Sequence, residues 1–150
     1  MSYRNVAASF MGAALLLSST AFAAVDPVKK AIELLGSAVP TIQAQMVSMS
    51  QGCSGGSNGV PPVSWGALQV HGYGAVNELH AGQMSLQGGQ IPDGVQHIKT
   101  GLVEYDALIN GLALSCSGGA HGENPVSYGN YVEFRNNLKT QLQTIIQFLQ

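Results

Sequence analysis

Apolar residues recur at intervals of three and four positions in four stretches of the chain. The first stretch has this pattern at Val28, Ile32, Leu35, Val39, Ile42, Met46 and Met49. The third has it at Ile91, Val95, Ile98, Leu102, Tyr105, Ile109 and Leu112. An α-helix has about 3.6 residues per turn, so this spacing places the apolar side chains of each stretch on one helix face.

The second and fourth stretches, about 63–87 and 126–150, carry the same pattern with different residues. The second has Trp65, Leu68, Gly72, Ala75, Leu79, Gly82 and Leu86. The fourth has Tyr128, Tyr131, Arg135, Leu138, Leu142, Ile145 and Leu149. Glycine lowers helix propensity by about 1 kcal/mol relative to alanine. The glycines of the second stretch therefore indicate either a closely approaching backbone or a loosely packed helix.

The pattern of the first two stretches recurs in the last two after a shift of 63 residues. The segments 53–66 (CSGGSNGVPPVSWG) and 116–129 (CSGGAHGENPVSYG) agree at 9 of 14 positions without a gap. Short connections between helices of similar length favour antiparallel neighbours. We therefore predict an all-α fold: an up-down-up-down four-helix bundle of two tandem helical-hairpin repeats, about 26–87 and 89–150.

Glycine and proline mark the ends of these helices. Gly88 and Gly89 are placed to end the second helix, and Pro92 and Pro125 suit the first turns of the third and fourth. Pro40 lies inside the first helix, where it removes one backbone hydrogen bond. The sequence leaves open whether Pro40 kinks this helix or splits it.

Residues 1–23 have the features of a secretory signal peptide. Arg4 provides a positive start, an apolar run covers 6–17, and Ala21-Phe22-Ala23 is a cleavage site with small residues at both ends. We expect a single domain at 24–150 in the periplasm or outside the cell, with no transmembrane span after cleavage.

Cys53 and Cys116 are the only cysteines, and they occupy equivalent positions in the two repeats. Cysteines of an exported protein are expected to pair. An intramolecular Cys53–Cys116 disulfide would join the two hairpins at one end of the bundle. Pairing between chains is the alternative, because the first and third helices could be too far apart.

Charged residues make up only 9% of the chain, and the formal net charge is −2. Nucleic-acid binding is not expected, because there is no basic patch. No enzyme is expected either, since the Gly-Gly segments lack the lysine of a P-loop and the two cysteines are expected to be oxidised. The weakly charged surface makes a homo-oligomer an open alternative.

A candidate metal site comprises His80, Met84 and His97. Folding the second hairpin connection near residue 89 brings His80 and His97 to similar heights, and Met84 follows His80 by one helical turn. Copper accepts imidazole and thioether ligands, and haem is a further possibility. In the alternative interpretation, the histidines are boundary residues and the methionine fills a gap. The equivalent positions in the other repeat are Gln143, Gln147 and Leu34.

Three functions remain open at this point. The first is a non-catalytic protein of the cell envelope that binds another envelope or secreted protein, as an adaptor, an immunity-type inhibitor or an interaction factor. The second is a periplasmic binder of copper, haem or a small ligand. The third is a self-assembling structural subunit.

Overall fold

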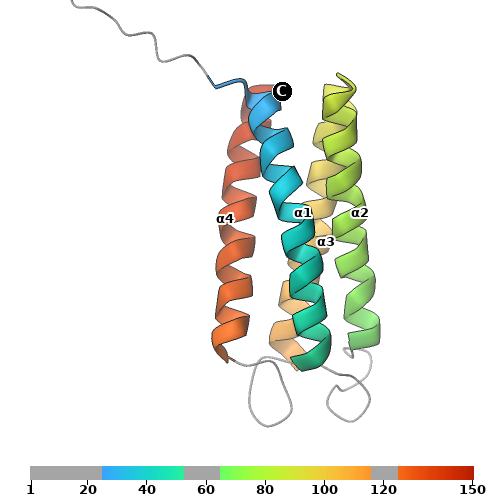
Figure 1. Cartoon of the computed structure of the whole chain (residues 1–150), viewed down its shortest axis with the longest axis vertical. Coiled ribbons are helices and arrows are strands. Elements are labelled where there is room, and N and C mark those ends of the chain that lie inside the picture. The colour runs from blue at the N-terminus through green and yellow to red at the C-terminus, as the bar shows by residue number, and fades with distance from the viewer. Residues whose placement is uncertain (1–24, 53–64, 116–124) are drawn as a thin grey trace, which may run out of the picture.

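A computed structural model of the chain describes residues 25–52, 65–115 and 125–150. These residues form four α-helices and no strand: α1 Pro27–Gly52, α2 Trp65–Gln87, α3 Ile91–Ser115 and α4 Pro125–Leu149 (Figure 1). The predicted all-α class and the four helices are confirmed. The predicted signal peptide and the predicted Cys53–Cys116 disulfide lie outside the described residues.

The helices lie side by side, and each packs against two others (Figure 1). The main contacts are α1 with α2, α2 with α3, α3 with α4, and α4 with α1. The start of α1, the turn between α2 and α3, and the C-terminus of the chain all lie at the same end of the molecule (Figure 1). Because α1 and α3 each pack against α2 and α4, they lie diagonally opposite each other. The groove between α1 and α2 and the groove between α3 and α4 therefore face different directions.

Local sequence explains where the helices begin and end. Asp26 caps α1, because its Oδ1 accepts a 2.9 Å hydrogen bond from the backbone N–H of Val28. At the end of α2, Gly89 has φ of +75°. Its N–H donates to Leu86 O, and the N–H of Gln90 donates to Ser85 O. This pair of bonds is the Schellman motif, which requires a left-handed residue that glycine adopts at little cost.

Helix α1 continues through Pro40 without a break, so the splitting interpretation is wrong. The Pro40 side chain is exposed, and on the preceding turn Ser37 O accepts a 2.8 Å hydrogen bond from Thr41 Oγ1. A long helix with both its flanks packed tolerates one missing backbone bond.

Most of the predicted apolar stripes are buried. Side chains with no exposed surface include Leu35, Ile42, Met49, Leu79, Ile98, Tyr105, Ile109, Leu112 and Leu142. Buried Ala31, Ala38, Val76, Leu108 and Ile146 were not in the predicted stripes. Two residues per heptad are too narrow a stripe for a helix that packs against two neighbours.

The α2/α3 interface, formed around Leu79, Gly82, Gly94 and Gly101, brings two backbones together. A Cβ atom on Gly82 would lie 3.2 Å from Gly94 O, and one on Gly94 would lie 3.2 Å from Gly82 O. A Cβ atom on Gly101 would lie 3.1 Å from the backbone nitrogen of Leu79. For Gly82 of α2, close backbone approach is therefore confirmed, whereas a Cβ atom at Gly72 or Gly74 would meet the side chains of Met46 and Glu104.

Candidate functional site

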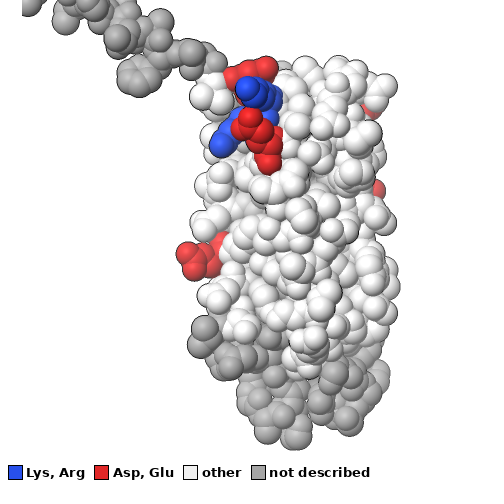
Figure 2. All heavy atoms as spheres, viewed as in Figure 1, with Lys and Arg blue, Asp and Glu red and all other residues white. Residues whose placement is uncertain are grey.

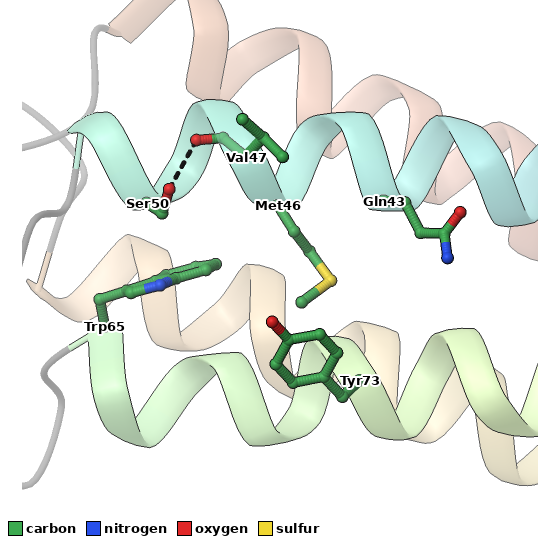
Figure 3. Close-up of a pocket in the computed structure, with 6 residues that line it drawn as sticks. All are labelled: Gln43, Met46, Val47, Ser50, Trp65 and Tyr73. Carbon is green, nitrogen blue, oxygen red and sulfur yellow. Dashed lines mark hydrogen bonds between the residues drawn. The ribbon is translucent and has the colours of Figure 1, made fainter.

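The α1/α2 groove is an open cavity of about 390 Å³ near the C-terminal end of α1. It is lined by Gln43, Met46, Val47, Ser50, Trp65 and Tyr73 (Figure 3). The Met46 side chain extends from α1 toward α2, between the indole of Trp65 and the phenol ring of Tyr73 (Figure 3). The lining therefore combines a thioether and two aromatic rings with one amide and one hydroxyl group.

Glycine in α2 makes room for Met46. A Cβ atom on Gly72 would lie 2.7 Å from Met46 Sδ, so the absence of a side chain there lets the thioether pack against the α2 backbone. Ser50, also in the lining, donates a 2.7 Å hydrogen bond from its Oγ to Val47 O, which satisfies the hydroxyl within the helix (Figure 3).

Apolar side chains around the groove remain in solvent. Val47 and Tyr73, which line the groove, are 60% and 58% exposed, and Val70, outside the lining, is 64% exposed. Val70 and Tyr73 are three residues apart and therefore neighbours on one side of α2. Exposed apolar side chains that gather around a cavity are a common feature of binding surfaces.

The surface around this groove carries almost no charge. From Leu34 to Asn77 the sequence has no Asp, Glu, Lys or Arg. Figure 2 shows the same result in space: acidic and basic atoms gather near the start of α1, and most of the face over α1 and α2 is uncharged. A strongly charged ligand would find no ionic partner here.

The structure places the predicted metal ligands on α2 and α3 as follows. His80 is exposed, Met84 is 55% exposed, and His97 is half-buried with its Nδ1 2.7 Å from Glu78 Oε2. Glu78 and His80 are two positions apart, so their side chains diverge by about 200° around α2. Among the described residues, no three His, Cys, Asp or Glu side chains cluster as metal ligands. The His80/Met84/His97 site stays a prediction.

Two histidine–carboxylate pairs cross the α2/α3 interface. His71 Nδ1 of α2 lies 2.7 Å from Glu104 Oε2 of α3, and His97 Nδ1 of α3 lies 2.7 Å from Glu78 Oε2 of α2. The four side chains are between 34% and 45% exposed. Sequence reasoning missed both pairs. The signal was a His-x₆-Glu spacing in each helix, at His71 and Glu78 and again at His97 and Glu104.

Tyrosine hydroxyls bind polar groups of α1. Tyr105 has no exposed surface, and its hydroxyl donates a hydrogen bond to Gln45 Oε1. Tyr131 of α4 donates a 2.7 Å hydrogen bond to Ser48 Oγ. Burial raises the pKa of Tyr105, which keeps the phenol neutral. The rings of Tyr105 and Phe134 are 6.3 Å apart and nearly perpendicular. These polar groups fix the register of α3 and α4 against α1.

The α3/α4 groove has a different chemistry. Asp106 accepts from Arg135 Nη1 at 3.1 Å and from Lys139 Nζ, so one carboxylate faces two cations. From there a cavity of about 580 Å³ extends along Leu102, Val103 and Ile146 to Lys99. This groove combines cations with apolar side chains, whereas the α1/α2 groove has no charged residue.

No family model, curated protein or solved structure matches this chain. Within 25–52, 65–115 and 125–150, none of the helices combines the length and apolar character needed to cross a membrane.

Proposed function

We propose that this protein is an exported, non-catalytic factor that binds a protein partner through the α1/α2 groove. The observation that carries the proposal is the pair of exposed apolar side chains, Val47 and Tyr73, in the lining of a groove without charge. Met46, Trp65 and Tyr73 supply the residue types that are enriched in protein–protein interfaces.

The shape of the groove favours a protein over a small molecule. Its cavity is open to solvent, and Val47 and Tyr73 in its lining are both more than half exposed. A small ligand would be buried on most of its surface, whereas a partner helix or loop covers a wider, shallower area.

The proposed scaffold is a four-helix bundle made by duplication of one hairpin. A shift of 63 residues carries α1, Pro27–Gly52, onto 90–115, and α3 is Ile91–Ser115. In this scaffold the Cys53–Cys116 disulfide joins the two hairpins at the end where the α1/α2 groove lies. Export follows from the predicted signal peptide at 1–23.

Site-specific photo-crosslinking in the native host tests this proposal. A photoreactive residue at Val47 or Tyr73 of the full-length chain should give a crosslinked product of one defined mass. Val103 of α3 is the matched control, because it is 66% exposed and remote from the groove. The proposal predicts no such product from Val103. Equal products from Val47 and Val103, or none from either groove position, would contradict it.

Affinity for the partner identified in this way gives a second measurement. Tyr73→Ala removes an exposed ring and should weaken binding at least tenfold if the ring is an energetic centre of the interface. Val103→Ala should leave the affinity unchanged.

Copper binding at His80, Met84 and His97 is a second candidate function. Its support is the sequence pattern, since the contact of His97 Nδ1 is with Glu78, whose side chain diverges by about 200° from that of His80. Titration of the purified protein with Cu⁺ should show one equivalent bound, and His80→Ala with His97→Ala should abolish it. Retention of copper by that double variant would exclude this site.

Self-assembly through the weakly charged surface is the remaining alternative. A sizing column over a hundredfold range of protein concentration tests it. A mass that stays at that of one chain would exclude it.

A further inference from the structure

The α3/α4 groove is longer than one cavity. The cavity of about 580 Å³ ends at Lys99, and a second of about 340 Å³ continues from Lys99 to Pro92. From Pro92 to Asp106 the groove spans about 21 Å along α3, at about 1.5 Å per residue. Its apolar lining is Val95, Leu102, Val103, Ile146 and Leu149. This shape suits an extended chain better than a compact polar molecule.

Lys99 is the cation available to a ligand in this groove. Lys139 and Arg135 are both paired with Asp106. Among the described residues, Lys99 has no carboxylate within ion-pair distance, and it lies where the two cavities join. On the facing helix, no acidic residue occurs from Thr140 to Gln150. The groove therefore has positive charge in excess beside the exposed apolar side chain of Val103.

Val103 shows how much of this surface is uncovered. Its side chain is 66% exposed although it lies between the packed helices α3 and α4. Gln143 and Gln147, on α4, are uncharged, and the charged residues Lys139 and Asp106 of the same lining are paired with each other. An alkyl chain laid over Val103 would displace water from apolar atoms.

We propose that the α3/α4 groove binds a single-chain amphipathic anion, namely a free fatty acid. Its carboxylate pairs with Lys99, and its alkyl chain lies over Leu102, Val103 and Ile146. The volume of about 580 Å³ is within the range of roughly 300–1,000 Å³ that is usual for small-ligand sites. This site lies on the opposite side of the molecule from the α1/α2 groove, so the two proposals stand or fall separately.

Calorimetric titration of the folded protein with fatty acids below their aggregation concentration tests the proposal. Octanoate, decanoate and dodecanoate should each bind one to one. Affinity should rise about two- to fourfold per added methylene, because each buried methylene contributes to transfer from water. No saturable binding of dodecanoate would overturn the proposal, as would an affinity independent of chain length.

Two pairs of variants test the location. Lys99→Gln should weaken dodecanoate binding about tenfold and should not change the binding of decanol, which has no charge. Lys30→Gln, at an exposed lysine of α1, is its control. Val103→Asp should abolish binding, because it puts an anion under the alkyl chain. Val70→Asp is its control, since Val70 is 64% exposed on α2. Equal losses in variant and control would overturn the assignment to this groove.

Trp65 distinguishes the two grooves. It is the only tryptophan of the chain, and it lines the α1/α2 groove. Dodecanoate bound between α3 and α4 should leave the emission of Trp65 unchanged, and a saturable shift would place the ligand in the other groove.

Flotation with anionic phospholipid vesicles distinguishes a free fatty acid from the anionic lipids of a membrane surface. Lys99-dependent flotation without binding of free dodecanoate would indicate a membrane surface instead and would overturn the proposal.

Discussion

The α2/α3 interface and the α3/α4 groove share α3 and differ in the size of the facing residues. Between α2 and α3, Gly82, Gly94 and Gly101 let the backbones touch. Between α3 and α4, Arg135 and Lys139 reach over to Asp106, and an open cavity remains beside them. The same helix is thus packed closely on one side and leaves room for a ligand on the other.

This difference explains where polar residues can lie. Where the backbones touch, polar side chains bond across the flank of the interface, as His71 does to Glu104 and His97 to Glu78. Where the helices are kept apart by large side chains, charges and apolar surface line the same groove. Helix separation, set by glycine or its absence, determines which side of α3 is structural and which is open to solvent.

The largest effect is expected from Gly101→Val. A Cβ atom at Gly101 would lie 2.7 Å from Leu79 Cγ and 3.1 Å from the Leu79 backbone nitrogen, and the backbone cannot move aside as a side chain end can. We expect the free energy of unfolding, measured in urea, to fall by about 3 kcal/mol. Gly129→Val is the control, since nothing lies within 4 Å of a Cβ there. A Gly101→Val protein as stable as the unmodified chain would show that α2 and α3 are not in backbone contact.

Tyr105→Phe should lower the free energy of unfolding by about 1.5 kcal/mol, because it leaves Gln45 Oε1 without its donor inside the protein. The control is Tyr73→Phe, since Tyr73 is 58% exposed and its hydroxyl has water as a partner. Equal effects of the two substitutions would argue against the buried hydrogen bond.

The burial of Tyr105 can also be tested by measuring unfolding at alkaline pH. Burial raises the pKa of Tyr105 above its ordinary value of about 10, so the unfolded chain loses this proton at a lower pH than the folded one. The contribution of the neutral Tyr105 phenol to the free energy of unfolding is complete below a pH of about 10 and is lost as the pH rises further. Unfolding measured from pH 8 to 11 should therefore show a decline that is smaller in Tyr105→Phe. An identical decline in both proteins would contradict the burial of this phenol.

Gly129→Ala and Gly94→Ala should change the free energy of unfolding in opposite directions. At Gly129 the added methyl group meets nothing within 4 Å, so the gain in helix propensity should raise the free energy of unfolding by about 0.5–1 kcal/mol. At Gly94 the Cβ would lie 2.8 Å from Leu86 Cγ and 3.2 Å from Gly82 O, and stability should fall. Stabilisation by both would mean that glycine is not required at the α2/α3 interface.

The smallest effect concerns the half-exposed pair His71 and Glu104. A double-mutant cycle with His71→Gln and Glu104→Gln should give a coupling energy of about 0.5 kcal/mol, reduced by salt. A cycle of His71→Gln with Glu78→Gln is the control and should be additive, because these residues do not contact each other. Coupling in the second cycle but not in the first would contradict the crossed pairing.

Much of the helical architecture could be predicted from the sequence. The apolar stripes begin at Val28 and Ile91, within one residue of the observed starts of α1 and α3, and Gly88-Gly89 and Pro92 marked the turn between α2 and α3. These features are local, so they are decided by propensity, capping and periodicity. Pro40 was left open, because the cost of one lost backbone bond depends on how firmly the rest of α1 is packed.

The candidate sites could not be predicted in the same way. The α1/α2 groove depends on Met46 packing over Gly72, which requires the register of two helices. The crossed His–Glu pairs also depend on register, although their repeated spacing was visible in the sequence. His97 was selected for its height near His80, but height leaves the direction of a side chain around its helix undetermined.

The central claim is that α2 and α3 form the rigid part of the molecule, while the surfaces for ligands lie on the adjoining grooves. Native-state amide hydrogen exchange tests it residue by residue. We predict the slowest exchange in α2 and α3 around Leu79, Gly82, Gly94 and Gly101, and faster exchange in the second half of α4. Equal protection of α4, or faster exchange at these glycines than in α4, would contradict the account.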